Sequence, residues 1–136
     1  MSFVLDSSVS LSWCFDDERT DATDALLEHV VEAGAVAPAL WPLEVLNALV
    51  MAERRSRIDA ERRQRLAGFL RDLPVTIDEE TASQAWVVTS QLAARFRLTV
   101  YDAAYLELAQ RRGLPLATLD QELRAAAAAL GVTLLG

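Results

Sequence analysis

The sequence has few of the residues that several familiar kinds of functional site require. It contains one histidine, His29, one cysteine, Cys14, and no lysine, and its five glycines stand apart from one another. One histidine and one cysteine exclude a structural zinc site, and separated glycines exclude a glycine-rich phosphate loop. His29 follows Glu28 in a helical pattern that is typical of a surface position. A serine triad would need this histidine, and RNA cleavage by a pair of histidines is excluded.

Long hydrophobic runs are also absent. The longest apolar run covers residues 33–43, is interrupted by one glycine and two prolines, and is too short to cross a bilayer. No targeting segment is expected before Asp6. A lone cysteine permits no internal disulfide, which suits a reducing compartment. We therefore expect a cytoplasmic protein that makes no membrane contact.

Negative charge predominates, with a formal net charge of −7, and at first this argues against a nucleic-acid partner. Positive charge is nevertheless concentrated in residues 53–71, which hold seven of the 13 basic residues, all of them arginine. Four of these arginines are candidates for RNA binding, because arginine pairs well with phosphate. They are Arg54, Arg55, Arg62 and Arg63. The alternative is a solvated helix face with internal ion pairs such as Glu61 with Arg65.

Short apolar runs alternate with helical patterns along the chain. The apolar runs predict strands at residues 3–5, 35–37, 74–77, 114–118 and 132–135. The helical patterns predict helices at about residues 9–15, 21–33, 39–55, 60–70, 78–96, 99–113 and 121–130. Such alternation indicates right-handed crossovers and a parallel sheet covered on both faces. We expect one α/β domain over residues 1–136, a three-layer α/β/α sandwich around a parallel sheet of four to five strands.

Four acidic residues share a setting in this pattern. Each stands near the start of a predicted helix among apolar neighbours, whereas the other sixteen acids mostly stand among polar residues. The four are Asp6, Glu44, Asp102 and Asp120. Any one of them is as well explained by helix capping or by the helix dipole, an effect of about 0.3–1 kcal/mol. The set carries more weight, because helices that start at one edge of a sheet bring their first turns together.

Carboxylates gathered in one crevice cannot all stay ionised without a cation. Oxygen donors suit Mg²⁺ or Mn²⁺ better than zinc, so metal-assisted hydrolysis agrees with the residues that are present. Two other enzyme classes fit less well. A phosphatase with an aspartate nucleophile after its first strand needs a second aspartate where this chain has Ser8, and it also needs a lysine. A phosphoacceptor receiver domain needs the same missing lysine.

The motifs that contain the four acids resemble those of a known family. They are VLDSS at residues 4–8, PLEVLNAL at 42–49, TVYDAAYLELA at 99–109 and LATLD at 116–120. In order and spacing, over essentially the whole chain, they are similar to the acidic motifs of PIN-domain ribonucleases, and in particular of the VapC toxins of bacterial toxin–antitoxin pairs. Each motif alone has little specificity, and the resemblance rests on the set.

This resemblance implies a PIN-like fold and a Mg²⁺- or Mn²⁺-dependent endoribonuclease that cuts structured RNA, often tRNA or rRNA. It implies that the four acids hold the metal, with Asp6 and Asp102 as direct ligands. Ser7 and Thr118 match accessory hydroxyl positions of the family, and Asn47 matches a polar position one turn after the glutamate.

The resemblance also implies protein partners. These are a second copy in a homodimer, or a toxin–antitoxin hetero-oligomer, and a small cognate antitoxin that blocks the site, often with an arginine. Apolar residues such as Trp41, Leu46, Leu49 and Trp86 could serve these interfaces, but a core position is favoured for them in a chain of this length. A catalytically silent interaction module with the same fold is the alternative to a nuclease.

Overall fold

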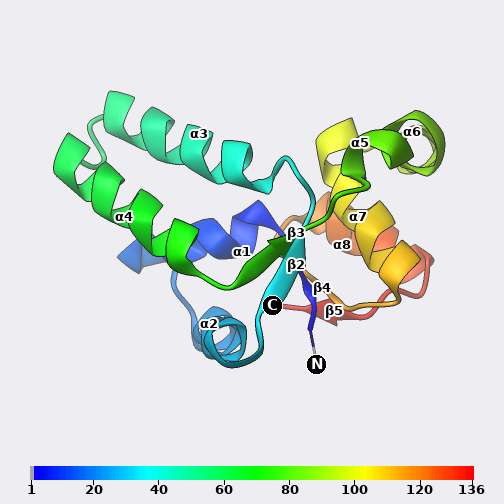
Figure 1. Ribbon diagram of the computed structural model, residues 1–136, viewed down its shortest axis with the longest axis horizontal. Helices are drawn as coiled ribbons and strands as arrows, with labels where there is room; N and C mark the ends of the chain where they lie inside the picture. The colour runs from blue at the N-terminus through cyan, green and yellow to red at the C-terminus, as the bar shows by residue number, and fades with distance from the viewer. Residues whose placement is uncertain (1) are drawn as a thin grey trace.

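The computed structural model describes residues 2–136 and contains one parallel sheet of five strands (Figure 1). The strands are β1 (Val4–Leu5), β2 (Ala35–Ala37), β3 (Val75–Ile77), β4 (Leu116–Ala117) and β5 (Leu134–Leu135). Their order across the sheet is β3-β2-β1-β4-β5, and each neighbouring pair is parallel. The strand predictions are confirmed, although most strands are shorter than the apolar runs that predict them.

Several of the helices begin where the sequence supplies a capping signal. They are α1 (Ser7–Ser12), the 3₁₀ turn η1 (Asp16–Glu18), α2 (Asp21–Ala33), α3 (Trp41–Arg54), α4 (Ala60–Asp72), α5 (Thr81–Gln84), the π-helical turn η2 (Ala85–Thr89), α6 (Ser90–Phe96), α7 (Val100–Arg112) and α8 (Gln121–Ala129). The side chains of Thr20, Asp59 and Thr99 each accept a backbone N–H in the first turn of α2, α4 and α7. Pro42 stands in the first turn of α3, where its missing N–H leaves no hydrogen bond unmade.

One helix prediction is confirmed except at its start. Helical backbone runs without a break through α5, η2 and α6, with a π-turn inside it, but it begins after Glu80 and Asp78 is not its N-cap residue. Asp78 is buried and binds Arg111 of α7 at 2.6 Å. Its side chain is therefore used to hold α7 against the segment after β3.

The helices form a layer on each face of the sheet. Figure 1 shows α1 to α4 on one side of the strands and α5 to α8 on the other. The strand order explains this arrangement, because the chain runs outward from β1 to β3, returns to β4 beside β1, and continues outward to β5. Right-handed crossovers in opposite directions place their helices on opposite faces. The predicted three-layer α/β/α sandwich is confirmed.

The core interpretation of the large apolar residues is half right. Trp41 is 5% exposed and Leu49 is fully buried, but Trp86 is 87% exposed and Leu46 is 43% exposed. The buried residues of α3 recur at a helical spacing that leaves Leu46 on a different side. In η2 the buried residue is Thr89, and the side chain of Trp86 lies on the solvent side of the turn.

Two further features complete the fold. Trp13 and Cys14 lie in the core, as their neighbourhood in the sequence predicts. Across residues 2–136, every helix falls short of the length and apolar character that a bilayer crossing would need.

Candidate active site

Asp6 follows β1 at the point where the strand order reverses, between β1 and β4. In open α/β sheets the ligand crevice lies outside the carboxyl ends of the strands at such a point. Asp6 is 3% exposed, and its N–H continues the ladder by donating to the Ala117 carbonyl at 3.0 Å. It is the N-cap residue of α1, yet its side chain makes no capping hydrogen bond. The backbone N–H groups of Ser7 and Ser8 still lower the pKa of its carboxyl, so the capping interpretation accounts for only a part of its setting.

Two hydroxyls hold the Asp6 carboxylate instead. Ser8 donates to Oδ2 at 2.6 Å and Thr118, directly after β4, donates to the same oxygen at 2.7 Å. Each hydroxyl oxygen also accepts a backbone N–H, from Leu119 at 2.9 Å and from Asp120 at 3.1 Å respectively. An ionised carboxylate can only accept hydrogen bonds, so each hydroxyl gives its proton to Asp6 and uses a lone pair for the backbone N–H. The ends of the two central strands are thereby joined around one carboxylate.

The two hydroxyls orient the Asp6 carboxylate but bring no positive charge to balance it. Burial raises its pKa, and the hydrogen bonds from Ser8 and Thr118 oppose this only in part. Within residues 2–136, none of the ion pairs includes Asp6. A buried carboxylate without a positive partner costs free energy, and such groups are concentrated at functional sites.

Asp78 provides an internal comparison, because it is buried to the same degree. Its residue exposure is 2%, and Arg111 donates to Oδ2 at 2.6 Å while Arg112 lies 3.4 Å from Oδ1. Burial acts against the charge of Asp78 as well, but the hydrogen bonds and the charge of Arg111 outweigh burial and hold its pKa below the usual value. The chain thus supplies arginines to one buried aspartate and only hydroxyls to the other.

Glu44 approaches the same place from the first turn of α3. Its Oε1 accepts a hydrogen bond from the Tyr105 hydroxyl of α7 at 2.5 Å. Burial raises the pKa of Glu44, and the charges of Asp6 and Asp102 raise it further against the opposing hydrogen bonds from Tyr105 and Ser7. Glu44 therefore lies within electrostatic reach of both aspartates.

Asp102 and Asp120 complete the group. Burial raises the pKa of Asp102, and the charges of Asp120 and Asp6 add to the effect. Asp120 caps α8, since its Oδ1 accepts the Leu123 N–H at 2.9 Å. The capping interpretation holds for this one oxygen of Asp120. The structure brings together four carboxylates from four separate segments of the chain.

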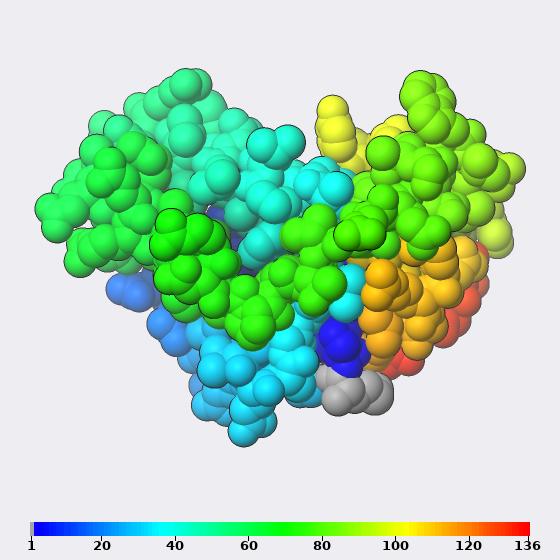
Figure 2. All heavy atoms as spheres, in the orientation of Figure 1, coloured from blue at the N-terminus to red at the C-terminus, as the bar shows by residue number. Residues whose placement is uncertain are grey.

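Two of the four acids come from helices on opposite sides of a notch in the molecular surface. One side is the hairpin of α3 and α4, which carries Glu44, and the other is formed by α5 to α7, which carries Asp102. Figure 2 shows the notch between these two parts of the molecule.

The donor set suits a hard divalent cation. All donors are oxygens. Burial raises the pKa of Asp6, Glu44 and Asp102, and repulsion from neighbouring acids adds to the effect at Glu44 and Asp102; a bound positive charge would relieve both. In the part of the chain that the structure describes, no three acidic, histidine or cysteine side chains converge into a ready-made metal cage. Mg²⁺ needs no such cage, because it is usually held by one or two carboxylates and keeps several waters.

The predicted accessory residues differ in how they relate to the acids. The Ser7 hydroxyl acts on the pKa of both Glu44 and Tyr105, so it stands beside that pair. Thr118 contacts Asp6 directly. Asn47 is exposed on α3, and no hydrogen bond within residues 2–136 joins it to an acid.

The four arginines predicted to bind RNA lie at the other end of the α3–α4 hairpin. Arg54, the last residue of α3, is ten residues beyond Glu44, which corresponds to roughly 15 Å along a helix. Arg63 forms an ion pair with Glu53. Among the described residues, Arg54, Arg55 and Arg62 take part in no ion pair, so the hairpin tip carries uncompensated positive charge.

Other arginines of this segment match the solvated, ion-paired alternative. Arg57 binds Asp17 and Glu18, and Arg71 binds Asp72. The expected pair of Glu61 with Arg65 is not among the ion pairs of residues 2–136. The basic segment is therefore mixed, with paired and unpaired arginines side by side.

Two residues of the site are missed by sequence reasoning. The acidic motifs point to Ser7 and not to Ser8, although Ser8 stands only two residues after Asp6 and a short hydroxyl at this spacing can reach back to an aspartate. Tyr105 lies three residues after Asp102 on α7, which places it on the same helix face. This spacing could have located Tyr105 near the acids, but nothing local reveals its bond to Glu44.

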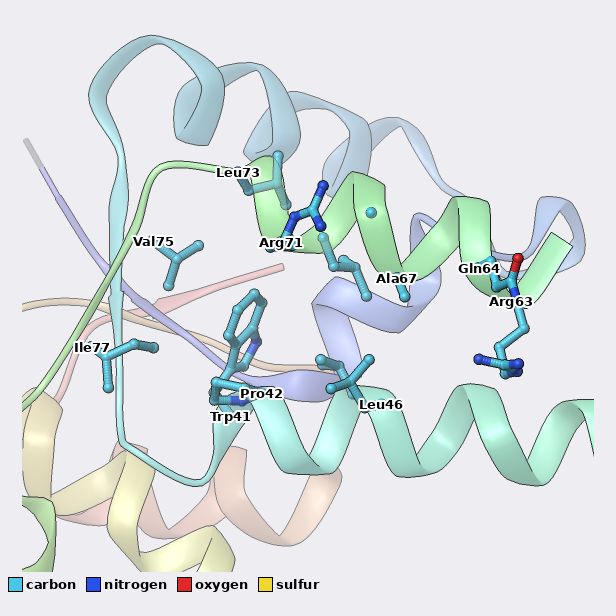
Figure 3. A pocket seen from close by; sticks show the side chains of 13 residues that line it. Trp41, Pro42, Leu46, Arg63, Gln64, Ala67, Arg71, Leu73, Val75 and Ile77 are labelled. Carbon is cyan, nitrogen blue, oxygen red and sulfur yellow. The ribbon is translucent and has the colours of Figure 1, made fainter. Parts of the chain in front are cut away.

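An apolar groove of about 500 Å³ lies between α3, α4 and β3 (Figure 3). Figure 3 shows Trp41 and Leu46 of α3 opposite Ala67 of α4, with Val75 of β3 at one end. None of the four acids lines this groove. It is separate from the site that the carboxylates form.

The PIN domain family model matches residues 3–129. The chain belongs to the PIN domain family. A curated relative of this PIN-domain protein is Ribonuclease VapC3 of Pyrobaculum aerophilum, which is 29% identical over 127 residues, or 90% of this chain and 92% of that protein. The resemblance drawn from the four acidic motifs is confirmed at the level of the family.

Solved structures share the PIN fold. The crystal structure of PAE2754 from Pyrobaculum aerophilum has a TM-score of 0.72 at 24% identity, over 98% of this chain and 83% of that chain. FitAcB from Neisseria gonorrhoeae has a TM-score of 0.68 at 16% identity, over 100% of this chain and 97% of that chain. VapBC2 from Rickettsia felis, bound to a DNA fragment from its promoter, has a TM-score of 0.65 at 12% identity, over 98% of this chain and 97% of that chain.

Proposed function

We propose that residues 1–136 form a single nuclease domain that acts as a metal-dependent endoribonuclease toxin of the VapC type. The observation that carries this proposal is the Asp6 carboxylate, which is buried, oriented by two hydroxyls and left without a positive partner at the switch point of the sheet. The match to the PIN domain family and the likeness to Ribonuclease VapC3 support it.

The proposed catalytic residues are Asp6, Glu44, Asp102 and Asp120. Asp6 and Asp102 are the proposed direct ligands of Mg²⁺ or Mn²⁺, and Glu44 and Asp120 supply further negative charge beside them. A bound divalent cation steadies the phosphate and makes water more acidic. Glu44 is half-buried, and its raised pKa makes its ionised carboxylate a stronger base, which suits a group that takes a proton from attacking water.

The proposed substrate is structured RNA, with tRNA and rRNA as the classes that the family resemblance favours. Phosphate contacts supply most of the non-specific affinity of proteins for nucleic acid, and they come from positively charged side chains. Within residues 2–136 no ion pair joins an arginine to any of the four acids, and the tip of the α3–α4 hairpin carries Arg54, Arg55 and Arg62 without acidic partners. We propose that the tip attracts RNA and the crevice cuts it.

The proposed partners are a cognate antitoxin and a second copy of the chain. A crevice with four carboxylates favours a cationic side chain, so an antitoxin that inserts an arginine would block both the metal and the substrate. The likeness to VapBC2 and FitAcB supports an antitoxin partner. We place the activity in the cytoplasm, where cellular RNA and a reduced Cys14 are both expected.

Incubation of the purified protein with total bacterial RNA tests the proposal. The reaction is run with Mg²⁺ or Mn²⁺, beside reactions with EDTA and with an Asp6→Asn variant, and new 5′ ends are mapped. We expect discrete cuts that need metal and are lost in Asp6→Asn. An Asp78→Asn variant serves as the matched control, because Asp78 is equally buried but lies outside the crevice, and it should keep the cuts at a temperature below its melting point.

Two results would count against a nuclease. Cuts that persist in EDTA, or in Asp6→Asn, would mean that a contaminant or a different site is responsible. Metal binding without any cut, across tRNA, rRNA and mRNA pools, would favour the catalytically silent interaction module.

A further inference from the structure

Tyr105 is a buried tyrosine whose hydroxyl is committed to a proposed catalytic acid. Its residue exposure is 0%, and it stands on α7, one turn after Asp102. The hydroxyl donates to Oε1 of Glu44 on α3, 61 residues away in the sequence, at 2.5 Å. The Ser7 hydroxyl lies beside the same pair. One helix therefore carries both an acid of the site and the group that holds another acid.

The hydrogen bond joins the two sides of the notch. Glu44 belongs to the α3–α4 hairpin, and α3 packs mainly against α1 and α4 rather than against α7. A glutamate has three rotatable bonds, so a half-buried glutamate on this hairpin would otherwise sample several orientations. The bond to Tyr105 engages Oε1 and leaves Oε2 without a bond to this tyrosine.

A neutral donor suits this task better than a cationic one. The Arg111 guanidinium that holds Asp78 also cancels its charge, and a carboxylate held in that way attracts a metal ion poorly. The tyrosine hydroxyl fixes the orientation of Glu44 and leaves its negative charge intact. Ser8 and Thr118 treat Asp6 in the same manner.

We propose that Tyr105 is a positioning residue that fixes the Glu44 carboxylate for the divalent cation and for the reaction that this cation supports. The inference rests on the proposed function and adds to it a residue that never touches metal or RNA. Loss of an outer hydrogen-bond partner that orients the groups of a metal site typically weakens metal affinity or activity by about 10–100-fold.

Mn²⁺ binding to Tyr105→Phe tests the inference. The variant keeps the buried ring and removes only the hydroxyl. Free Mn²⁺ is measured by electron paramagnetic resonance during titration of the intact protein, and kcat and KM are measured on a cleaved RNA. We expect the Kd for Mn²⁺ to rise about tenfold or more and kcat to fall, with KM for RNA unchanged. The matched control is Tyr101→Phe, which removes the same atom from an exposed tyrosine on the same helix and should bind Mn²⁺ like the wild type.

A double variant separates positioning from general loss of structure. If Tyr105 acts through Glu44, Tyr105→Phe should have no further effect on Mn²⁺ affinity when combined with Glu44→Gln. An added loss in the double variant, or a wild-type Kd in Tyr105→Phe, would overturn the inference while leaving the nuclease proposal intact. A wild-type protein that binds no Mn²⁺ and cuts no RNA would overturn both.

Discussion

The same substitution should have opposite effects at the two buried aspartates. Asp78→Asn removes a charge that Arg111 and Arg112 bind, whereas Asp6→Asn removes a charge that hydroxyls hold but no ion pair within residues 2–136 balances. Breaking a buried ion pair costs about 3–5 kcal/mol, but Arg111 keeps Glu107 at 2.8 Å and Glu80 at 2.9 Å. We therefore expect Asp78→Asn to lower the free energy of unfolding by about 2–3 kcal/mol.

Asp6→Asn should raise the free energy of unfolding in the absence of metal. The asparagine carbonyl can still accept the hydroxyls of Ser8 and Thr118, and the amide group places donors near the other carboxylates. We expect a gain of about 1–2 kcal/mol from removing a desolvated, unpaired charge. For a chain of this size, 1 kcal/mol corresponds to a change in melting temperature of about 4 °C.

Thermal unfolding followed by circular dichroism at pH 7 in EDTA measures both changes. Asp78→Asn should melt about 8–12 °C below the wild type, and Asp6→Asn about 4–8 °C above it. The Asp78 difference should also depend on pH. Its folded pKa lies below the usual 3.8, so its stabilisation is complete above that pH and is lost as the pH falls further. If Asp6→Asn melted as low as Asp78→Asn, Asp6 would be a structural residue and the reasoning would be refuted.

Two other predictions concern the basic hairpin and the lone thiol. Arg55→Glu should weaken RNA binding and lower the slope of log K against log salt by about 0.7 for each RNA phosphate that the variant no longer binds. Arg71→Glu makes the same charge change at an arginine that is already paired with Asp72, and it should have little effect. Equal slopes for the two variants in a filter-binding series would contradict a role of the hairpin tip in RNA binding. Cys14 is 2% exposed, and burial raises the pKa of its thiol to about 11. The thiol should therefore resist a disulfide reagent at pH 8 until the protein is unfolded. Prompt reaction in the native state would contradict the core position of Cys14.

Much of the fold follows from local patterns in the sequence. Apolar runs mark the strands, and Thr20, Asp59 and Thr99 mark helix starts, because both signals depend on residues close together in the chain. The proximity of the acids can also be predicted from the order of strands and helices. Parallel strands have their carboxyl ends, and the starts of the helices that follow, along one edge of the sheet.

Interactions between distant segments could not be predicted in the same way. The bond from Tyr105 to Glu44 and the ion pair of Arg111 with Asp78 depend on how α7 packs, and no local spacing encodes that packing. Asp78 has the sequence context of a helix cap and proves to be the anchor of a buried ion pair. An ordinary helical period places Trp86 on the buried side of its helix, but this period does not hold in η2, where the helix takes a π-turn.

The central claim is that Asp6 belongs to a metal site, and Mn²⁺ titration of three proteins tests it most directly. Wild type, Asp6→Asn and Asp78→Asn are compared at pH 7 by electron paramagnetic resonance, below the melting temperature of the least stable variant. Wild type and Asp78→Asn should bind Mn²⁺ with the same Kd, and Asp6→Asn should bind at least about tenfold more weakly. Equal binding by Asp6→Asn and wild type would contradict the account.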